Sequence, residues 1–181
     1  MEIFAAISTL VCVFLLNKQN ILGWPIGIIA ATLYIFVFWK NELIFQSSLQ
    51  IIYILQSMYG WLYWKLKIQD NIVVKWKNAD ILAYTLLVIG VALSLTQYIR
   101  FLGIEVSMLD VITTLLALFA NYLLSEKVLQ SWYIWILVNI LLIPLMISQE
   151  LWWTVGLYSI LLLNSIHASI TWNKNYDTQR L

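Results

Sequence analysis

Three side-chain amides lie inside long apolar segments of this chain, where a carboxamide needs a hydrogen-bonding partner: Gln56, Asn139 and Asn164. If those segments cross a membrane, no water reaches the amides, and an unsatisfied polar group in hydrocarbon is costly. Each amide is therefore expected to bind another protein group or a polar solute. Two interpretations stay open: the amides hold helices together by bonding one another, or they line a cavity that binds a solute.

The three amides are predicted to lie at one depth. Gln56 and Asn164 each lie eight residues before a tryptophan that ends an apolar segment, and Asn139 lies nine residues after the start of another. At about 1.5 Å of rise per helical residue, all three are roughly 12–14 Å from the same membrane surface, near the middle of a core about 30 Å thick. This coincidence favours a shared cavity over separate helix contacts.

Ring side chains accompany two of the amides. Tyr59 follows Gln56 by three residues, and His167 follows Asn164 by the same interval. Residues three apart share a helical face, so each amide and its ring are expected to point the same way.

Tryptophans make a second candidate group. Trp132 and Trp135 lie on one side of the segment 130–147, with Asn139 one turn beyond Trp135. Stacking and cation–π attraction would let them hold a flat, cationic ring. Most of the tryptophans lie near the ends of apolar segments, where an aromatic belt at the membrane surface is expected. These are Trp24, Trp39, Trp61, Trp64, Trp132, Trp152, Trp153 and Trp172.

Other kinds of chemistry lack the residues they need. The chain has one histidine, His167, and one cysteine, Cys12, so neither a metal site nor an internal disulfide is expected. The absence of HExxH, GxSxG and P-loop motifs argues against an enzyme. No second acid or base near mid-membrane offers a proton relay. We therefore expect passive, gradient-driven transport without a cofactor, with a proton-coupled carrier as an alternative.

The chain repeats itself with a shift of 108 residues. Aligning residues 10–64 with 118–172 without a gap matches 15 of 55 positions, whereas random pairing at this composition would match roughly a tenth. Trp24 falls on Trp132 in this alignment. A duplicated membrane bundle with a site between its copies is a common plan of transporters, so the repeat favours transport over catalysis.

The composition is that of an integral membrane protein. Of the 181 residues, 62% are hydrophobic and 10% are charged, with a net charge of +1. These values exclude an ordinary soluble domain and give no basic surface for nucleic acid. Seven apolar segments predict an all-α integral membrane fold with seven transmembrane helices. The segments lie at about 3–16, 21–39, 43–64, 80–98, 108–124, 130–147 and 151–172.

The basic residues set the expected orientation. With the N-terminus outside, eight of the ten lysines and arginines, Arg180 among them, face the cytoplasm, and only Lys40 and Arg100 lie outside. This positive-inside bias predicts a multi-pass protein of the bacterial inner membrane with a cytoplasmic C-terminus.

Repeat and orientation together predict a 3+1+3 arrangement of parallel repeats. Residues 1–64 form the first three-helix repeat and residues 108–173 the second. Residues 65–107 hold a basic cytoplasmic loop, a connecting helix and an outer loop, and residues 174–181 form a cytoplasmic tail. The basic loop over 65–79 is expected to be a solvated linker or to contact anionic membrane lipid.

Several motifs resemble the PnuC family of bacterial vitamin transporters over nearly the whole chain. The matching residues are Leu49-Gln50, Tyr59-Gly60-Trp61 with Trp64, Asp110, Trp132 with Trp135 and Asn139, and Tyr158 with Trp172. The resemblance implies a homotrimer that takes up nicotinamide riboside by facilitated diffusion, with cytoplasmic phosphorylation trapping the vitamin. The expected substrate-binding residues are Gln50, Tyr53, Gln56, Tyr59, Trp132, Trp135, Asn139, Asn164 and His167.

Two residues depart from the pattern of the riboside transporters. Those members tend to have asparagine on the second and seventh helices, where this chain has Ala30 and His167. Relatives that look like this chain carry thiamine, which is also a flat cation with a hydroxyl group. Thiamine is therefore the alternative substrate, and a membrane subunit that transports nothing is the remaining alternative.

Overall fold

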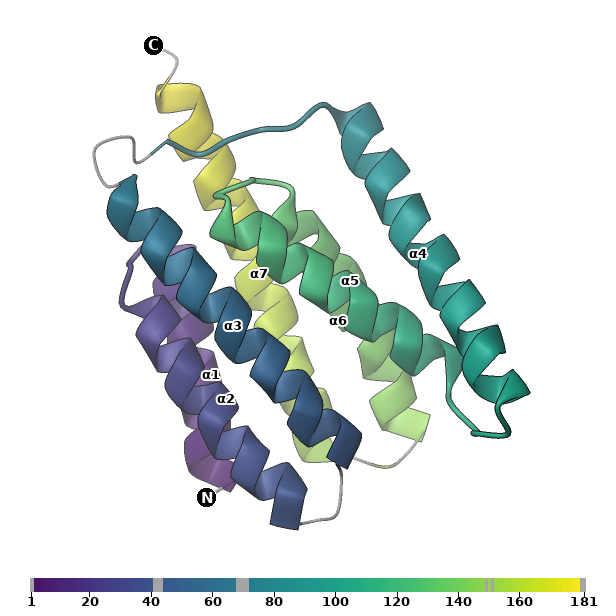
Figure 1. The fold of residues 1–181 in the computed structure, drawn as a ribbon. Coiled ribbons are helices and arrows are strands. Elements are labelled where there is room, and N and C mark those ends of the chain that lie inside the picture. The colour runs from purple at the N-terminus through teal and green to yellow at the C-terminus, as the bar shows by residue number, and fades with distance from the viewer. Residues whose placement is uncertain (1, 41–43, 68–71, 149, 151, 180–181) are drawn as a thin grey trace. The chain divides into compact units, whose positions relative to one another are not determined.

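Each apolar segment forms one helix in the computed structural model, which describes residues 2–40, 44–67, 72–148, 150 and 152–179. The predicted all-α class and the seven helices are confirmed within these residues (Figure 1). The helices are α1 Glu2–Asn17, α2 Gly23–Lys40, α3 Ile44–Leu66, α4 Asn78–Phe101, α5 Met108–Ser125, α6 Ser131–Ser148 and α7 Trp152–Thr178. α7 continues into the expected tail, and Arg180 lies outside the described residues.

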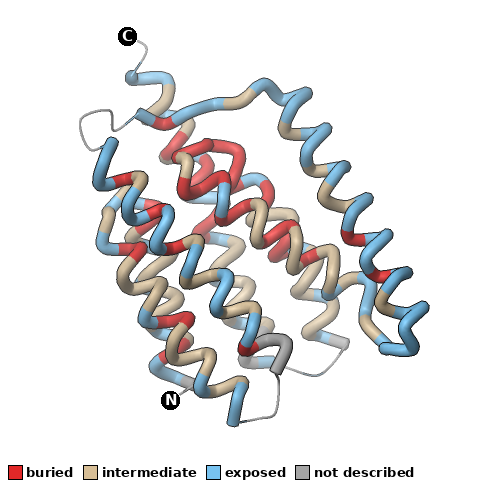
Figure 2. Tube along the Cα trace, in the orientation of Figure 1, coloured by how far each residue is buried: buried red, intermediate tan, exposed pale blue. Residues whose placement is uncertain are grey.

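Helix length and apolarity agree with a membrane protein. By these criteria α2, α4, α5 and the part of α7 from Val155 to Thr178 are able to cross a membrane, and α1 and α6 carry shorter apolar stretches. At about 1.5 Å per residue, an 18-residue helix is about 27 Å long, close to the thickness of the hydrocarbon core. Large apolar side chains are exposed along these helices, as a lipid-facing surface requires. Figure 2 shows that exposed positions recur along the helices. A span through the more polar α3 stays a prediction.

The chain divides into two compact units, Met1–Ile72 and Val73–Leu181. In the first unit, α2 packs against both α1 and α3. In the second unit, α6 packs against α5 and α7, while α4 packs against α5. Each expected three-helix repeat therefore lies in one unit, and the connecting helix α4 belongs to the second. The parallel relation of the repeats stays a prediction.

The 108-residue repeat is also visible in the backbone, in the turns that follow α1 and α5. Gln19 and Lys127 have positive φ angles of 54° and 56°. In each turn, the backbone amide of the positive-φ residue donates a 3.0 Å bond to the carbonyl three residues earlier. The amide of the following residue donates to the carbonyl five residues before it, at 2.8 Å after α1 and 2.9 Å after α5. This is the Schellman pattern of helix termination, here without glycine. The two repeats thus share their turn geometry as well as residues.

Four of the tryptophans form two equivalent buried pairs. The Trp24 and Trp64 rings lie edge to face with centroids 5.4 Å apart, and the Trp132 and Trp172 rings do the same at 5.5 Å. All four side chains are at most 3% exposed. The expected membrane-surface belt is therefore wrong for these residues, which instead join the second and third helices of each repeat. Trp39, Trp61 and Trp152 are exposed, as a belt requires, and the side chain of Trp153 lies outside the described residues.

Gly60 brings α3 close to α2. A Cβ atom at this position would lie 2.6 Å from the Trp24 ring, closer than side-chain atoms approach. Ala168 takes the equivalent place in the second repeat and is fully buried. Gly60 is therefore a packing residue that makes room for the first tryptophan pair.

The segment that precedes α4 is docked on the protein, although a solvated or lipid-bound loop was expected over 65–79. Val73 is fully buried, and Val74 forms an isolated parallel bridge with Val128. A free linker is therefore wrong for residues 73–76, whereas contact of the exposed Lys75 and Lys77 with anionic lipid stays a prediction. Residues 68–71 of that loop lie outside the described residues.

Candidate functional site

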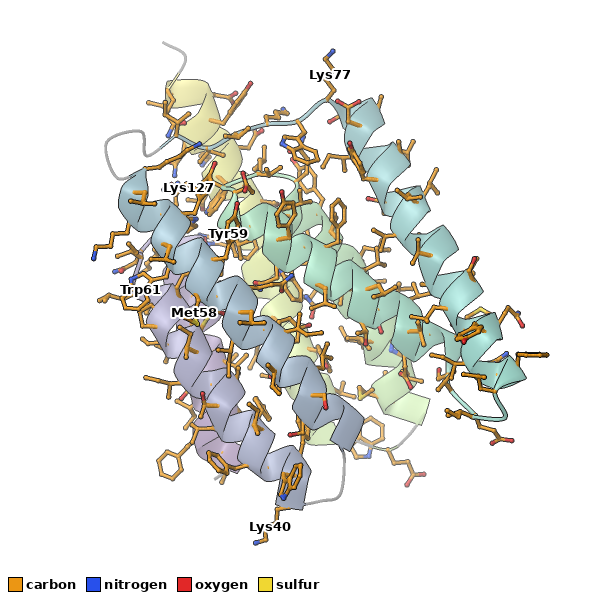
Figure 3. All side chains as sticks on the ribbon, viewed as in Figure 1. Lys40, Met58, Tyr59, Trp61, Lys77 and Lys127 are labelled. Carbon is orange, nitrogen blue, oxygen red and sulfur yellow. The ribbon has the colours of Figure 1, made fainter. Side chains whose placement is uncertain are left out.

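The predicted site residues of the first unit form a row along α3. Gln50, Tyr53 and Gln56 are half-buried, and Tyr59 is 42% exposed (Figure 3). Because each step of three residues turns back by about 60° around a helix, the row turns by about 180° between Gln50 and Tyr59. The four side chains therefore do not share one face. Neighbours in the row, such as Gln56 and Tyr59, differ in direction by only about 60° around the helix axis.

On helix α6, a hydrogen bond joins two of the predicted residues. Asn139 is only 2% exposed, and its Nδ2 donates a 2.7 Å hydrogen bond to the backbone carbonyl of Trp135. This bond confirms that the two residues lie on one side of the helix. Trp135 itself is half-buried and packs against the apolar cluster of Leu116, Ala117 and Val138. A rigid indole ring and a buried amide thus lie one turn apart.

Trp132 is more completely buried than a ligand-binding residue is expected to be. Its side chain is 1% exposed, and its ring packs on Trp172 as Trp24 packs on Trp64 in the first unit. Among the described residues, neither the buried indole Nε1 of Trp132 nor that of Trp24 has a hydrogen-bond partner. This equivalence between the units argues for packing, so the ring that would hold a ligand is Trp135.

Helix α7 contributes Asn164 and His167. Asn164 is 5% exposed, whereas His167 is exposed. In the first unit the equivalent Gln56 is likewise less exposed than Tyr59. In each pair, the amide is therefore more buried in the protein than the ring. Asn164 and Asn139 are both buried, on helices that pack together.

Asn121 and Gln130 are among the buried polar residues that were not predicted from the sequence. Asn121 on α5 is 9% exposed and lies inside an apolar segment, which is the same signal that revealed Asn139. Gln130 is 1% exposed and bonds the backbone of Trp76, 54 residues away. The only sequence signal for Gln130 is its contrast with Leu22 at the equivalent position of the first repeat.

One buried cation lies in the turn between α5 and α6. Lys127 is 6% exposed, and this burial lowers its pKa from 10.5 to about 8, because removal of water disfavours the charged form. Its ammonium group therefore stays mainly protonated at neutral pH. Among the described residues no three metal-ligating side chains lie together.

Comparison with known proteins supports the resemblance drawn from the motifs. The sequence profile described as "Nicotinamide mononucleotide transporter" matches residues 1–174. The nicotinamide riboside transporter PnuC of Neisseria mucosa is 26% identical, aligned over 94% of this chain and 70% of its own length. The PnuC protein of Haemophilus influenzae is also 26% identical, over 96% of this chain and 79% of its own length.

A solved structure shares the fold. A crystal structure of the vitamin B3 transporter PnuC superposes with a TM-score of 0.78, at 21% identity, over 97% of this chain and 81% of the other. The family profile covers nearly the whole chain and describes transporters, not enzymes. This multi-pass membrane protein therefore belongs to the nicotinamide mononucleotide transporter family, which includes the PnuC proteins.

Proposed function

We propose that this protein carries nicotinamide riboside across the bacterial inner membrane by facilitated diffusion. The observation that carries the proposal is the combination on α6 of a buried amide, Asn139, with a half-buried indole, Trp135. The PnuC relatives of Neisseria mucosa and Haemophilus influenzae, both named nicotinamide riboside transporters, support the same substrate.

The chemistry of nicotinamide riboside suits these residues. The molecule joins a flat pyridinium cation to a carboxamide and a ribose with free hydroxyls. An indole face attracts such a cation. Because Nδ2 of Asn139 already bonds to the Trp135 carbonyl, its Oδ1 can accept a hydrogen bond from the carboxamide or a hydroxyl. We propose that Gln50, Tyr53, Gln56, Tyr59, Asn164 and His167 supply further contacts.

The proposed driving force is the concentration gradient of the vitamin. Phosphorylation in the cytoplasm would turn the riboside into an anion that the site does not accept, which keeps the internal concentration of free vitamin low. A passive carrier needs no titrating group in its pathway, and the two residues that carry the proposal, Asn139 and Trp135, are a neutral amide and an indole.

Thiamine is the second candidate. Its thiazolium ring is a flat cation that Trp135 would hold in the same way. His167 and Ala30 favour it, because riboside-transporting members tend to have asparagine at both places. Ala30 is 5% exposed and belongs to the packing of the first unit, whereas His167 is exposed. A change of substrate would therefore act chiefly through His167.

We propose a homotrimer whose protomers have an external N-terminus and a cytoplasmic C-terminus. The eight to two distribution of lysines and arginines between the two sides supports this orientation. The trimer is an expectation from the resemblance to PnuC.

Calorimetry on the purified protein tests the substrate, with nicotinamide riboside and thiamine titrated side by side. We expect riboside to bind and Trp135→Ala to weaken binding by about tenfold, since loss of a desolvated cation–π contact costs about 1–2 kcal/mol. Trp39→Ala is the matched control, because Trp39 is 68% exposed and should leave binding unchanged. Binding of thiamine alone would reassign the substrate, and binding of neither would contradict the proposal.

A further inference from the structure

A short extended segment ties three helix ends of the second unit together. We define the strap as residues 73–77, which immediately precede α4. The amide of Val74 donates to the carbonyl of Lys127 at 2.9 Å, and the amide of Leu129 donates to the carbonyl of Val74 at 2.8 Å. These two bonds make the parallel bridge between Val74 and Val128. The strap is thereby held on the turn between α5 and α6.

Side chains from two further places hold the ends of the strap. The Oε1 of Gln130 accepts a 3.2 Å bond from the amide of Trp76, and its Nε2 donates a 2.7 Å bond to the carbonyl of the same residue. The amide of Val73 donates a 2.9 Å bond to Oε1 of Gln179, just after α7. One segment thus bonds to residues at the start of α6 and beyond the end of α7.

The residues that bond to the strap from the turn between α5 and α6 are buried, whereas the lysines of the strap are exposed. Val73, Val128, Leu129 and Gln130 are at most 1% exposed, and the ring of Trp76 packs on the apolar cluster of α5 and α6. Lys75 and Lys77 are exposed, and Lys77 projects outward at the start of α4 (Figure 3). Opening this segment would leave the buried amide of Val73 and the buried side chain of Gln130 without these partners, which is unfavourable.

The first repeat has the same turn but not the groups that hold a strap. The positions equivalent to Val128 and Gln130 are Asn20 and Leu22. The Asn20 side chain accepts a bond from the amide of Leu22 within its own turn, and Leu22 is 57% exposed. The strap is therefore a feature of the second repeat that its duplication does not explain.

From these contacts we infer that the strap stays closed throughout the transport cycle and makes α4 part of one rigid body with the second repeat. A gate would need to break and remake five hydrogen bonds in each cycle, and each of these bonds involves at least one buried residue. A permanent fastening needs no such step. The prediction about the cycle rests on the proposed transport function, whereas the closed strap itself does not.

A disulfide across the bridge tests both parts. In a Cys12→Ser background, Val74→Cys and Val128→Cys are combined, since neighbouring strand residues lie about 4.8 Å apart, within the range of a disulfide. We expect the thiols to cross-link in membranes under a mild oxidant, as measured by loss of maleimide labelling. Uptake of radiolabelled nicotinamide riboside by the oxidised protein should equal that of the reduced protein. The two single-cysteine variants control for effects of the oxidant.

Each other outcome is informative. Failure to cross-link would overturn the closed strap, and uptake lost on oxidation but restored by reductant would show that the strap must open. If the Cys12→Ser background takes up no riboside, the proposed substrate fails while the cross-link still reports on the strap. Independently, Gln130→Leu should lower the Tm of the purified protein, whereas Leu22→Gln at the equivalent exposed position should not.

Discussion

At the scale of single residues, two glycines in helices should respond to the same substitution with opposite signs. A Cβ at Gly60 would lie 2.6 Å from the Trp24 ring, which packs edge to face with the Trp64 ring. Gly60→Ala should therefore destabilise the protein by about 1–3 kcal/mol through overpacking. Gly90 on α4 has open space around it, so Gly90→Ala should stabilise the helix by up to about 1 kcal/mol.

Thermal unfolding of both variants in detergent measures the contrast. The wild-type Tm should lie between the two variant values. A Gly60→Ala protein at least as stable as the wild type would show that α2 and α3 do not approach as closely as the Gly60 contact requires. The Gly90→Ala variant is the control, because it adds the same methyl group where no overpacking is expected and should not lower the Tm.

The burial of two amides could be anticipated from the sequence, whereas the burial of the tryptophans could not. Asn139 and Asn164 are buried as predicted, because an amide inside an apolar segment has few alternatives. A tryptophan near the end of an apolar segment suits both a lipid headgroup and a protein core. Only the packed structure separates Trp24, which is buried, from Trp39, which is exposed.

At the scale of elements, the turn after α1 offers a test of the strain shared by the repeats. Gln19 has a φ of 54°, and its buried Oε1 has no hydrogen-bond partner within the part of the chain that the structure describes. Gln19→Gly should stabilise the protein by about 1 kcal/mol, because glycine adopts this conformation freely and the buried oxygen is removed. The Tm of the purified variant measures the gain. Gln19→Ala keeps the unfavourable φ and should gain less; a larger gain for alanine would contradict the role of backbone strain.

The helices were predictable and the strap was not, for a physical reason. An apolar segment determines its own helix through local composition, and the repeat doubles the evidence for every helix except α4. The strap depends on Gln130 bonding to Trp76, a contact between residues 54 positions apart. Nothing in the composition of 65–79 reveals such a partner, and its four lysines suggest a solvated loop.

At the scale of the whole molecule, the protein should equilibrate its substrate without consuming a proton gradient. The candidate residues Trp135, Asn139 and Asn164 do not titrate, and Lys127 stays mainly protonated at neutral pH. Purified protein in liposomes should therefore take up radiolabelled nicotinamide riboside at the same initial rate with and without a protonophore. Internal and external concentrations should become equal and go no further. Enclosing a riboside kinase with ATP should raise the accumulated label, because phosphorylation removes the free vitamin. Faster uptake under an inwardly directed proton gradient would instead require a proton-coupled carrier, and the exposed His167 would then be the first residue to replace.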